Sequence, residues 1–464
     1  MSLLSGLLAA LCFPKFNLWF LAWVALVPLF LEIQKKETPR SAAWSGFWFG
    51  IVFFGTNLFW INSLNEFAPV FAALGWIFLV IGESAFIAAA CYLIKYFKSP
   101  SLFPFTSSLI WTIFEWLRTL GPFGVSAGDL GYTQAANLPL IQIASLTTVF
   151  GVSFLIVLVN AVIADILNNL RLKSRLNLFK REFILGFLVI LLILSIYICG
   201  LSQIPPVPSS QFPGTLTISI IQGSLPQKQK MEARFNTSNF KIHEVLTRIA
   251  IEQKPDLIIW PETTIFSYLL YDPVLLPKIK KLAYDSKAYL IIGTPHYDNK
   301  GNIFNSVAAF SPSGEVIGRY DKQRLVPFGE YLPFRFISYP ILKITRLFYE
   351  DFDFGPKEAK LLDLNKLKIG VVICFESTFT DLLRNRVRRG ADLLLTVTND
   401  AWFNDSSAPY EHFNCGIFRA IENRKYFIQA ANTGISGVID PYGRILAQTQ
   451  VNQRMALTFK IPLP

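Results

Sequence analysis

Three residues in the second half of the chain could together perform acyl transfer through a thiol. Glu262, Lys322 and Cys374 each follow closely on a run of apolar or alternating residues that is typical of a strand. Strand ends are where α/β folds present the groups that bind and react with ligands. At such an edge a carboxylate can take the thiol proton, an ammonium can stabilise the thiolate and an oxyanion, and the thiol can carry the acyl group.

Each of the three residues also has a simpler interpretation. Cys374 can be one more small core residue, because free cysteines are usually buried and inert. Glu262 can be a carboxylate at the start of a helix, and Lys322 a solvated cation at the end of a strand. The catalytic interpretation is favoured because the three residue types occur together, and thiol acyl transfer requires that set.

The sequence around these residues resembles a known family. WPE at 260–262, the segment from Lys322 into LVPFGEYLP at 325–333 and ICFE at 373–376 resemble the Glu-Lys-Cys signature of the carbon-nitrogen hydrolase (nitrilase) superfamily. Other segments resemble one branch of it, the apolipoprotein N-acyltransferases: QGSLPQKQK at 222–230, TNDAWF at 398–403 and RAIENRKYFIQAANTGISGVIDPYGR at 419–444. Since the resemblance includes the apolar region ahead of these motifs, it covers nearly the whole chain.

The resemblance implies an acyltransferase. A fatty acyl chain would pass from a phospholipid, through a thioester on Cys374, to the N-terminal amine of an S-diacylglyceryl-cysteine on an apolipoprotein, the last step of lipoprotein maturation. Glu262 would act as the base, and Lys322 with nearby backbone N–H groups would stabilise the oxyanion. Glu330, in the VPFGE segment, would orient Lys322 and keep it charged.

The resemblance also implies supporting residues and partners. Phe375, Glu376 and Trp402 would surround the catalytic triad or position the substrate. The expected partners are a phospholipid acyl donor, a diacylglyceryl-lipoprotein acceptor and the membrane bilayer, and we expect a monomer without a cofactor. The three histidines have no ligand spacing, so we expect no metal, and the five cysteines imply no disulfide framework.

Some features depart from the family pattern. Phe375 stands where the family often has Tyr, and Met231 stands where Trp is common. Relatives usually close with another membrane span, whereas this sequence closes with TFKIPLP. One alternative is a membrane-tethered amidase that hydrolyses a small amide with the same triad. Another is a non-enzymatic membrane scaffold, which is disfavoured because all three triad positions are intact.

The composition indicates a membrane domain followed by a globular one. The chain has 464 residues, of which 52% are hydrophobic and 16% charged, and its long apolar runs lie almost entirely before residue 204. We therefore expect a multi-pass helical membrane domain at 1–203, a linker at 204–213 and a catalytic domain at 214–464. A cleaved signal peptide is disfavoured, because the start lacks a basic region and a small-residue cleavage site.

About seven apolar runs are candidates for membrane spans. They lie at 3–13, 18–33, 44–64, 67–94, 102–117, 138–167 and 183–201. The net charge of +11 lies largely in clusters beside these runs, around Lys35, Lys95 and Lys180. Clusters of this kind are typical of cytoplasmic membrane loops and not of a nucleic-acid groove. The sequence thus predicts an inner (plasma) membrane protein with its catalytic domain on the periplasmic side.

Two further features admit a structural or a functional interpretation. Glu83, Glu115 and Asp165 lie within or beside spans, where ionisable groups are functional candidates, although Glu115 could simply pair with Arg118. The insert 334–354 mixes aromatic and basic residues. It could be a buried helix, but we favour an arm that faces the membrane.

Strand and helix patterns alternate in the catalytic domain, which implies an α/β sandwich. The resemblance refines this fold class to the four-layer αββα nitrilase-like sandwich. We expect strands at 215–222, 256–260, 288–294, 367–374, 392–399 and 426–432, hairpins at 302–322 and around 441–443, and helices near 242–249, 274–284, 379–389 and 408–424.

Overall fold

The computed structural model describes the chain except for residues 68, 98–101, 172–175, 207–213, 335, 337–350, 359, 366 and 464. The described residues form two compact units. One contains Met1–Pro206 with Asp405–Asn414, and the other contains Val207–Asn404 with Cys415–Pro464. We call them the helical unit and, after the catalytic domain that the sequence predicts at 214–464, the catalytic unit.

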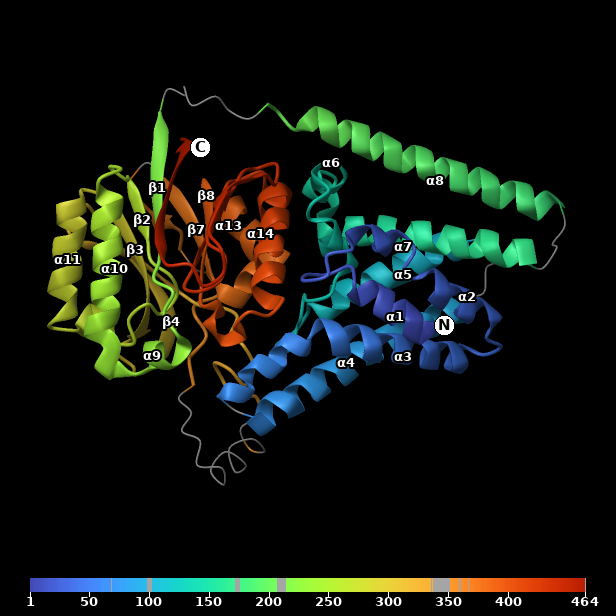
Figure 1. The fold of residues 1–464 in the computed structure, drawn as a ribbon, viewed down its shortest axis with the longest axis horizontal. Helices are drawn as coiled ribbons and strands as arrows, with labels where there is room; N and C mark the ends of the chain where they lie inside the picture. Colours follow the sequence, from blue (N-terminus) through green and yellow to red (C-terminus); the bar gives the residue numbers. More distant parts are fainter. Residues whose placement is uncertain are drawn as a thin grey trace. The chain divides into compact units, whose positions relative to one another are not determined.

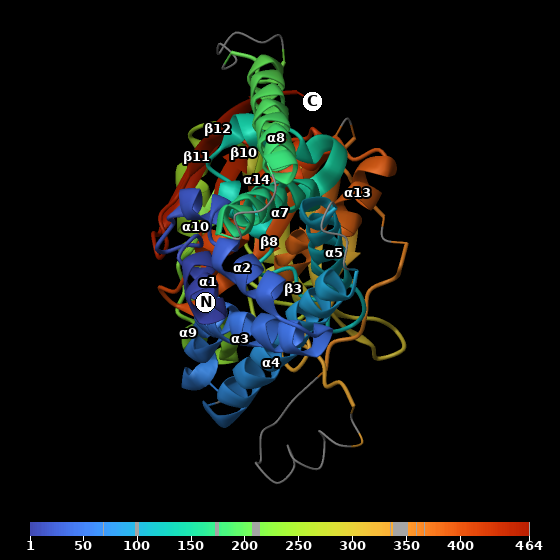
Figure 2. The ribbon, with the colours of Figure 1, turned by 90° about the vertical axis from the view of Figure 1, so that its right-hand side faces the viewer.

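The helical unit consists of α-helices joined by 3-10 turns (Figure 1). Its helices are α1 (Ser2–Ala10), α2 (Val27–Lys35), α3 (Pro39–Asn57), α4 (Pro69–Tyr96), α5 (Phe103–Arg118), α6 (Leu138–Ile141), α7 (Ala144–Arg171) and α8 (Leu176–Gln203), and its 3-10 turns are η1 (Trp19–Trp23), η2 (Phe59–Glu66) and η3 (Leu130–Gln134). Helices α7 and α8 lie side by side (Figure 2) and share a cluster of buried apolar residues that includes Leu158, Val162 and Val189.

Three described helices are long and apolar enough to cross a membrane. They contain Val70–Tyr96, Ala144–Leu170 and Arg181–Gln203, and α3 with η2 adds a fourth if this pair, bent by 45°, forms one span. Helices α1 and α2, with nine residues each, and α5, with 16, occupy other apolar runs but are shorter than a full span. The count of about seven spans stays a prediction.

Buried charges connect the helices of this unit. Arg118, at the end of α5, forms ion pairs with Glu83 of α4 at 3.1 Å and with Asp129 at 2.6 Å. Glu115 accepts hydrogen bonds from Trp111 Nε1 at 3.0 Å and from the Leu130 backbone N–H at 3.1 Å. The Arg118 guanidinium therefore links two helices to the segment before η3, and Asp129 was not predicted as its partner.

The catalytic unit contains two six-stranded sheets. The first has the order β12-β1-β2-β3-β4-β5 and the second β11-β10-β9-β8-β7-β6. The strands are β1 (Thr215–Gln222), β2 (Leu257–Ile259), β3 (Tyr289–Tyr297), β4 (Ile303–Phe310), β5 (Val316–Asp321), β6 (Leu362–Asp363), β7 (Lys368–Ile373), β8 (Leu393–Thr398), β9 (Phe427–Ala431), β10 (Gly437–Ile439), β11 (Ile445–Gln448) and β12 (Met455–Pro462).

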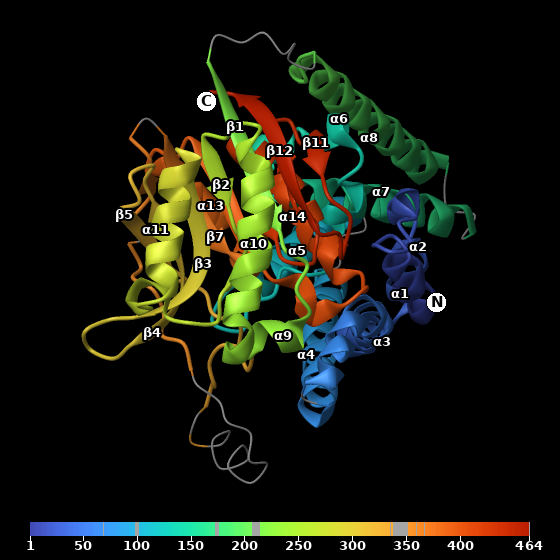
Figure 3. The same ribbon diagram turned by 60° about the vertical axis from the view of Figure 1, so that its left-hand side comes forward.

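Helices cover the outer faces of both sheets (Figures 1 and 3). Helices α10 (Asn236–Ile251) and α11 (Leu275–Ser286) pack on the first sheet, and α13 (Thr380–Arg388) and α14 (Ala408–Asn423) on the second. Alternate residues of the central strands face the other sheet, so that Ile218, Ile259 and Ile291 share a buried core with Val371 and Leu395. This arrangement is the four-layer αββα sandwich, and the predicted fold class is confirmed.

The predicted strands and helices agree with the observed ones, mostly within two residues at the ends of the strands. Gly314, with φ of +81°, makes the turn of the β4–β5 hairpin as predicted. Strand β12 was not predicted. It pairs antiparallel along the whole of β1, from Thr215 opposite Pro462 to Gln222 opposite Met455, so the last strand of the chain completes the first sheet.

Two predicted segments lie largely outside the described residues. The linker at 204–213 is described only through Pro206, and the arm at 334–354 only at Phe334, Phe336 and 351–354. Of the described aromatic residues there, Phe334, Phe336 and Phe354 are exposed. The membrane-facing role of the arm stays a prediction.

Replacing Arg118 with Leu tests the buried ion pairs of the helical unit. Glu83 and Asp129 would remain buried without their cation, and breaking such pairs costs about 3–5 kcal/mol. We expect a clearly lower midpoint of thermal unfolding in detergent. Arg40→Met, at an exposed position of α3, is the matched control and should leave the midpoint unchanged. Equal midpoints for both variants would contradict a stabilising role for Arg118.

Candidate active site

Strand β7 places Cys374 at its carboxyl end. Cys374 begins the 3-10 turn η6 (Cys374–Thr378) and has φ of +51°, a left-handed conformation that costs a residue other than glycine about 1–3 kcal/mol. The side chain of Ser377 donates to its carbonyl at 2.9 Å. Burial raises the pKa of the thiol, Glu262 and Asp400 raise it further, and Lys322 lowers it. The resting thiol is therefore protonated, and a reaction through it needs a base.

Glu376 connects the Cys374 turn to the segment that carries Lys322. One oxygen, Oε1, accepts the backbone N–H groups of Gln323 at 2.7 Å and Arg324 at 2.8 Å. The other, Oε2, accepts the Tyr320 hydroxyl and the Ile373 N–H, both at 2.8 Å. All four partners are donors, so the carboxylate fits this place without a proton of its own. Glu376 fixes the two segments relative to each other.

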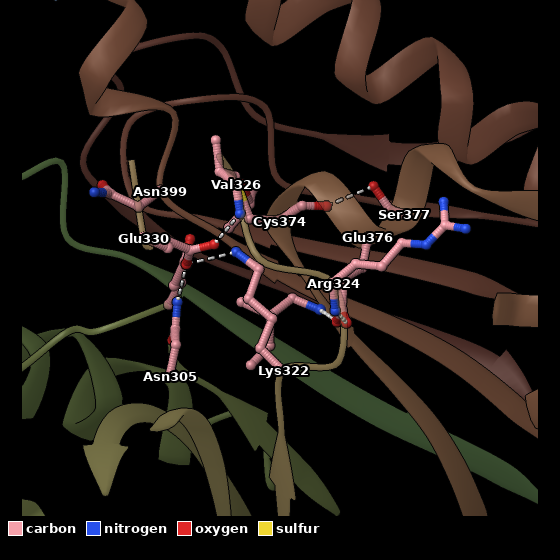
Figure 4. A network of polar contacts seen from close by, with 12 residues as sticks. Asn305, Lys322, Arg324, Val326, Glu330, Cys374, Glu376, Ser377 and Asn399 are labelled. Atoms are coloured by element: carbon pink, nitrogen blue, oxygen red, sulfur yellow. Dashed lines mark hydrogen bonds and ion pairs between the residues drawn. The ribbon is translucent and has the colours of Figure 1, made fainter. Parts of the chain in front are cut away.

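Lys322 is a buried cation between two carboxylates, and Figure 4 shows its contact with one of them, Glu330. It directly follows β5, its side chain is 1% exposed, and its Nζ lies 2.8 Å from Glu330 Oε1 and 3.7 Å from Glu262 Oε1. Burial lowers its pKa, but Glu330, Glu262 and Cys374 raise it more, so the pKa lies above its ordinary value. Lys322 is charged at neutral pH.

Asn305 holds the two carboxylates together. Its Nδ2 donates to Glu262 Oε1 at 2.7 Å and to Glu330 Oε1 at 2.8 Å, while the other oxygen of Glu330 accepts the Val326 N–H at 2.8 Å. Sequence reasoning missed Asn305. A signal was present, because it is one of two polar residues in the otherwise apolar strand β4, and a buried amide needs partners.

The structure brings Glu262, Lys322, Glu330, Cys374 and Glu376 into one connected site. Each follows a strand or lies in a segment between strands. Strands β2 and β5 of the first sheet run in the same direction, as do β7 and β8 of the second, so parallel strands deliver their carboxyl ends to a common edge. The catalytic role of the triad of Glu262, Lys322 and Cys374 stays a prediction.

Phe375 and Trp402 are the other two predicted site residues. Phe375 packs edge-on against Phe379 with ring centroids 4.8 Å apart, and the guanidinium of Arg324 lies 3.9 Å from the centroid of the Phe379 ring. Phe375 thus belongs to a stack beside Cys374. Trp402 is half-buried in the 3-10 turn η7 (Asp400–Phe403).

A second buried lysine at the site was also missed. Lys230 lies in the short helix α9 (Gln227–Met231), is 2% exposed and donates from Nζ to the carbonyl oxygen of Glu262 at 2.6 Å. Met231, its neighbour, is 43% exposed. The residue of this segment that reaches the site is therefore Lys230, and Met231 faces away from the core.

Two family models match the chain. The apolipoprotein N-acyltransferase N-terminal domain matches residues 5–162, and the carbon-nitrogen hydrolase model matches residues 217–464. A relative from Geobacter metallireducens named apolipoprotein N-acyltransferase is 36% identical over 100% of this chain and 89% of its own length. The chain belongs to the apolipoprotein N-acyltransferase family.

Other relatives with the same name have similar coverage. The one from Haemophilus influenzae is 31% identical over 99% of this chain and 88% of its own length. The one from Methylococcus capsulatus is 31% identical over 99% and 89%. The predicted resemblance to the apolipoprotein N-acyltransferase family is thus confirmed.

Glu376→Gln tests the link between the two segments of the site. An amide has one accepting oxygen, so its N–H groups would face two of the four donors and leave them unpaired. We expect a loss of about 2–4 kcal/mol in stability, seen as a lower thermal midpoint. Glu358→Gln, whose side chain is 88% exposed, is the control and should unfold as the wild type does. An unchanged midpoint for Glu376→Gln would show that Glu376 does not hold the segments.

Proposed function

We propose that this protein transfers a fatty acyl chain from a phospholipid to the N-terminal amine of an S-diacylglyceryl-cysteine, through a thioester on Cys374. Glu262 is the general base and acid, and Lys322 stabilises the negative charge of the oxyanion. The protein is an acyltransferase of the apolipoprotein N-acyltransferase family, which supports the reaction class. The lipid donor and lipoprotein acceptor follow from that class.

The observation that carries the residue assignment is the buried Lys322 between Glu262 and Glu330, beside a protonated thiol. A fixed, desolvated cation stabilises charge that develops in a transition state more strongly than a solvated one. Glu330 and Asn305 hold this cation and the base in place. The site therefore has a nucleophile, a base and an oxyanion partner before any substrate arrives.

In the first half-reaction Glu262 takes the thiol proton as the sulfur of Cys374 attacks the ester carbonyl of the phospholipid. Lys322 stabilises the tetrahedral oxyanion. Collapse of the intermediate breaks the ester C–O bond, and Glu262 returns the proton to the departing lysophospholipid oxygen. The acyl group is then held as a thioester, and Glu262 is again a carboxylate.

In the second half-reaction the neutral α-amine of the acceptor attacks the thioester carbonyl. Glu262 accepts a proton from the amine nitrogen, and Lys322 again stabilises the oxyanion. Breaking the C–S bond releases the Cys374 thiolate, which regains the proton from Glu262. The products are an amide-linked acyl chain and the starting enzyme.

The N-terminal family match favours lipoprotein N-acylation over hydrolysis of a small amide. An amidase needs only the catalytic unit, whereas this chain also carries the N-terminal domain of the acyltransferases and helices long enough to cross a membrane. A donor that lies in a bilayer requires an enzyme held at its surface. The protein is accordingly an inner membrane protein, and the basic loops support placing its catalytic unit on the periplasmic side.

Incubation of the purified protein with phospholipid alone tests the covalent mechanism. Thioester formation needs only the donor, so intact-protein mass spectrometry should find an added acyl mass on the wild type. Cys374→Ala should show none, and hydroxylamine should remove the adduct. Addition of a diacylglyceryl-cysteine peptide should discharge it to the peptide amine.

Cys415→Ala is the matched control, because Cys415 is another buried thiol of the catalytic unit and has no part in the mechanism. It should form the adduct at the wild-type rate. Discharge to water alone would favour the amidase, and an adduct on Cys374→Ala would contradict the thiol assignment.

Reporter fusions test the proposed orientation. A fusion after residue 176 should report the cytoplasm, since it follows a basic loop, and one after residue 206 should report the periplasm. The two sites flank α8, so a single crossing separates them. The same location for both fusions would exclude the proposed topology.

A further inference from the structure

Lys230 is, with Lys322, one of two buried lysines among the described residues of the catalytic unit. A lysine side chain is seldom buried, because taking its charge out of water is costly unless the site supplies compensating partners. Its Nζ donates to the Glu262 carbonyl oxygen at 2.6 Å. Lys228 of the same short helix is exposed. The helix therefore buries Lys230 and leaves its neighbouring lysine in solvent.

The segment that carries Lys230 is fixed to both sheets. After β1 ends, the side chain of Asn432 accepts the Leu225 N–H and donates to the Leu225 carbonyl, both at 2.9 Å. Asn399 donates to the Gln227 side chain at 2.7 Å and accepts from Asn432 at 3.0 Å. Because Asn399 follows β8 and Asn432 follows β9, α9 is anchored by strand ends of the second sheet.

From this anchored helix Lys230 reaches the end of β2 in the first sheet. The backbone there is strained, since Thr263, directly after Glu262, has φ of +42°. Thr264 Oγ1 donates to the Pro261 carbonyl at 2.6 Å, and Lys230 holds the next carbonyl along. The two bonds together fix the peptide planes on either side of the Glu262 Cα, and so the direction in which its carboxylate leaves the chain.

We propose that Lys230 is a positioning residue for acyl transfer: it fixes the Glu262 main chain so that the carboxylate meets Lys322 and Cys374, and it adds a second positive charge to the site. This role rests on the proposed use of Glu262 and Cys374. It differs from the role of Lys322, because the contact of Lys230 is with the Glu262 backbone and not with its carboxylate.

The charge on Lys230 is sensitive to pH near neutrality. Burial lowers its pKa to about 7, against the opposing effects of Glu262, Cys374 and Asp400. The other titratable group facing it is His243 of α10, whose own pKa is lowered to about 4 by burial, so His243 is neutral above pH 5. As pH rises through 7, Lys230 loses its charge, and the Cys374 thiolate loses part of its stabilisation.

Alkylation of Cys374 by iodoacetamide tests the charge without any lipid. The rate, followed by mass spectrometry of the Cys374 peptide, should rise with pH but with a reduced slope between about pH 6.5 and 7.5, where Lys230 discharges. In Lys230→Met the slope should be uniform. The rate at pH 6 should fall about tenfold, which corresponds to a thiol pKa raised by about one unit.

Two variants separate charge from packing. Lys230→Arg keeps a cation at every pH, so it should keep the rate at pH 6 and lose the reduced slope. Lys228→Met, a substitution at the exposed lysine two residues earlier, should match the wild type in rate and profile. Acyl-adduct formation from phospholipid, measured in parallel, should fall at least tenfold in Lys230→Met and be rescued in part by Arg.

The outcomes distinguish this proposal from the mechanism on which it rests. If alkylation follows the expected pH profile but the wild type forms no acyl adduct, the role of Lys230 is supported and the thioester mechanism is overturned. An adduct on the wild type together with unchanged alkylation and acylation in Lys230→Met would overturn the role of Lys230. If the Lys230 variants fail to fold, the wild-type profile decides, because a uniform slope across pH 7 overturns the proposal.

Discussion

The catalytic unit depends on keeping the ammonium of Lys322 charged inside the protein. An uncompensated buried charge costs several kcal/mol, so partners must be supplied with it. Glu330 lies at 2.8 Å, Glu262 at 3.7 Å, and Asn305 donates to both carboxylates. Each partner is held by a different part of the chain. The residues of this site therefore depend on one another, and the removal of any one leaves another without its partner.

The two-sheet architecture makes this arrangement possible. Glu262 and Lys322 come from the first sheet and Cys374 from the second, and residues facing inward from both sheets form one core. Because that core fixes the sheets against each other, side chains from different sheets meet reproducibly at their edge. Glu376 and the Asn399–Asn432 pair then cross from one sheet to segments of the other. The site is precise because rigid strands carry it and hydrogen bonds connect them.

Much of the catalytic unit could be predicted from the sequence, because strand and helix periodicity is local. The positions of β1, β7 and β8 follow from continuous apolar runs, and the strand-end residues follow from where these runs stop. Strand β12 was missed because it is an edge strand with mostly half-buried residues, which weakens the contrast between its faces.

Partners distant in sequence were harder to find. Asn305, Lys230 and Asp129 are polar residues whose importance depends on groups 43, 32 and 11 positions away along the chain. Periodicity carries no information on such pairs, and α9 is too short to show which of its lysines faces inward. In the helical unit, α1, α2 and α5 are shorter than a full span, so apolar composition alone does not fix the number of crossings.

The left-handed backbone of Cys374 has a consequence for how this enzyme can change. Glycine is the residue that accepts φ of +51° without cost, so the fold by itself would favour glycine where the proposed chemistry demands a thiol. Part of the stability of the two sheets is used to hold the proposed nucleophile in a conformation that its own side chain disfavours. Under the proposed mechanism, a glycine at this position would relieve the strain and remove the thiol, so stability and acyl transfer make opposite demands on residue 374.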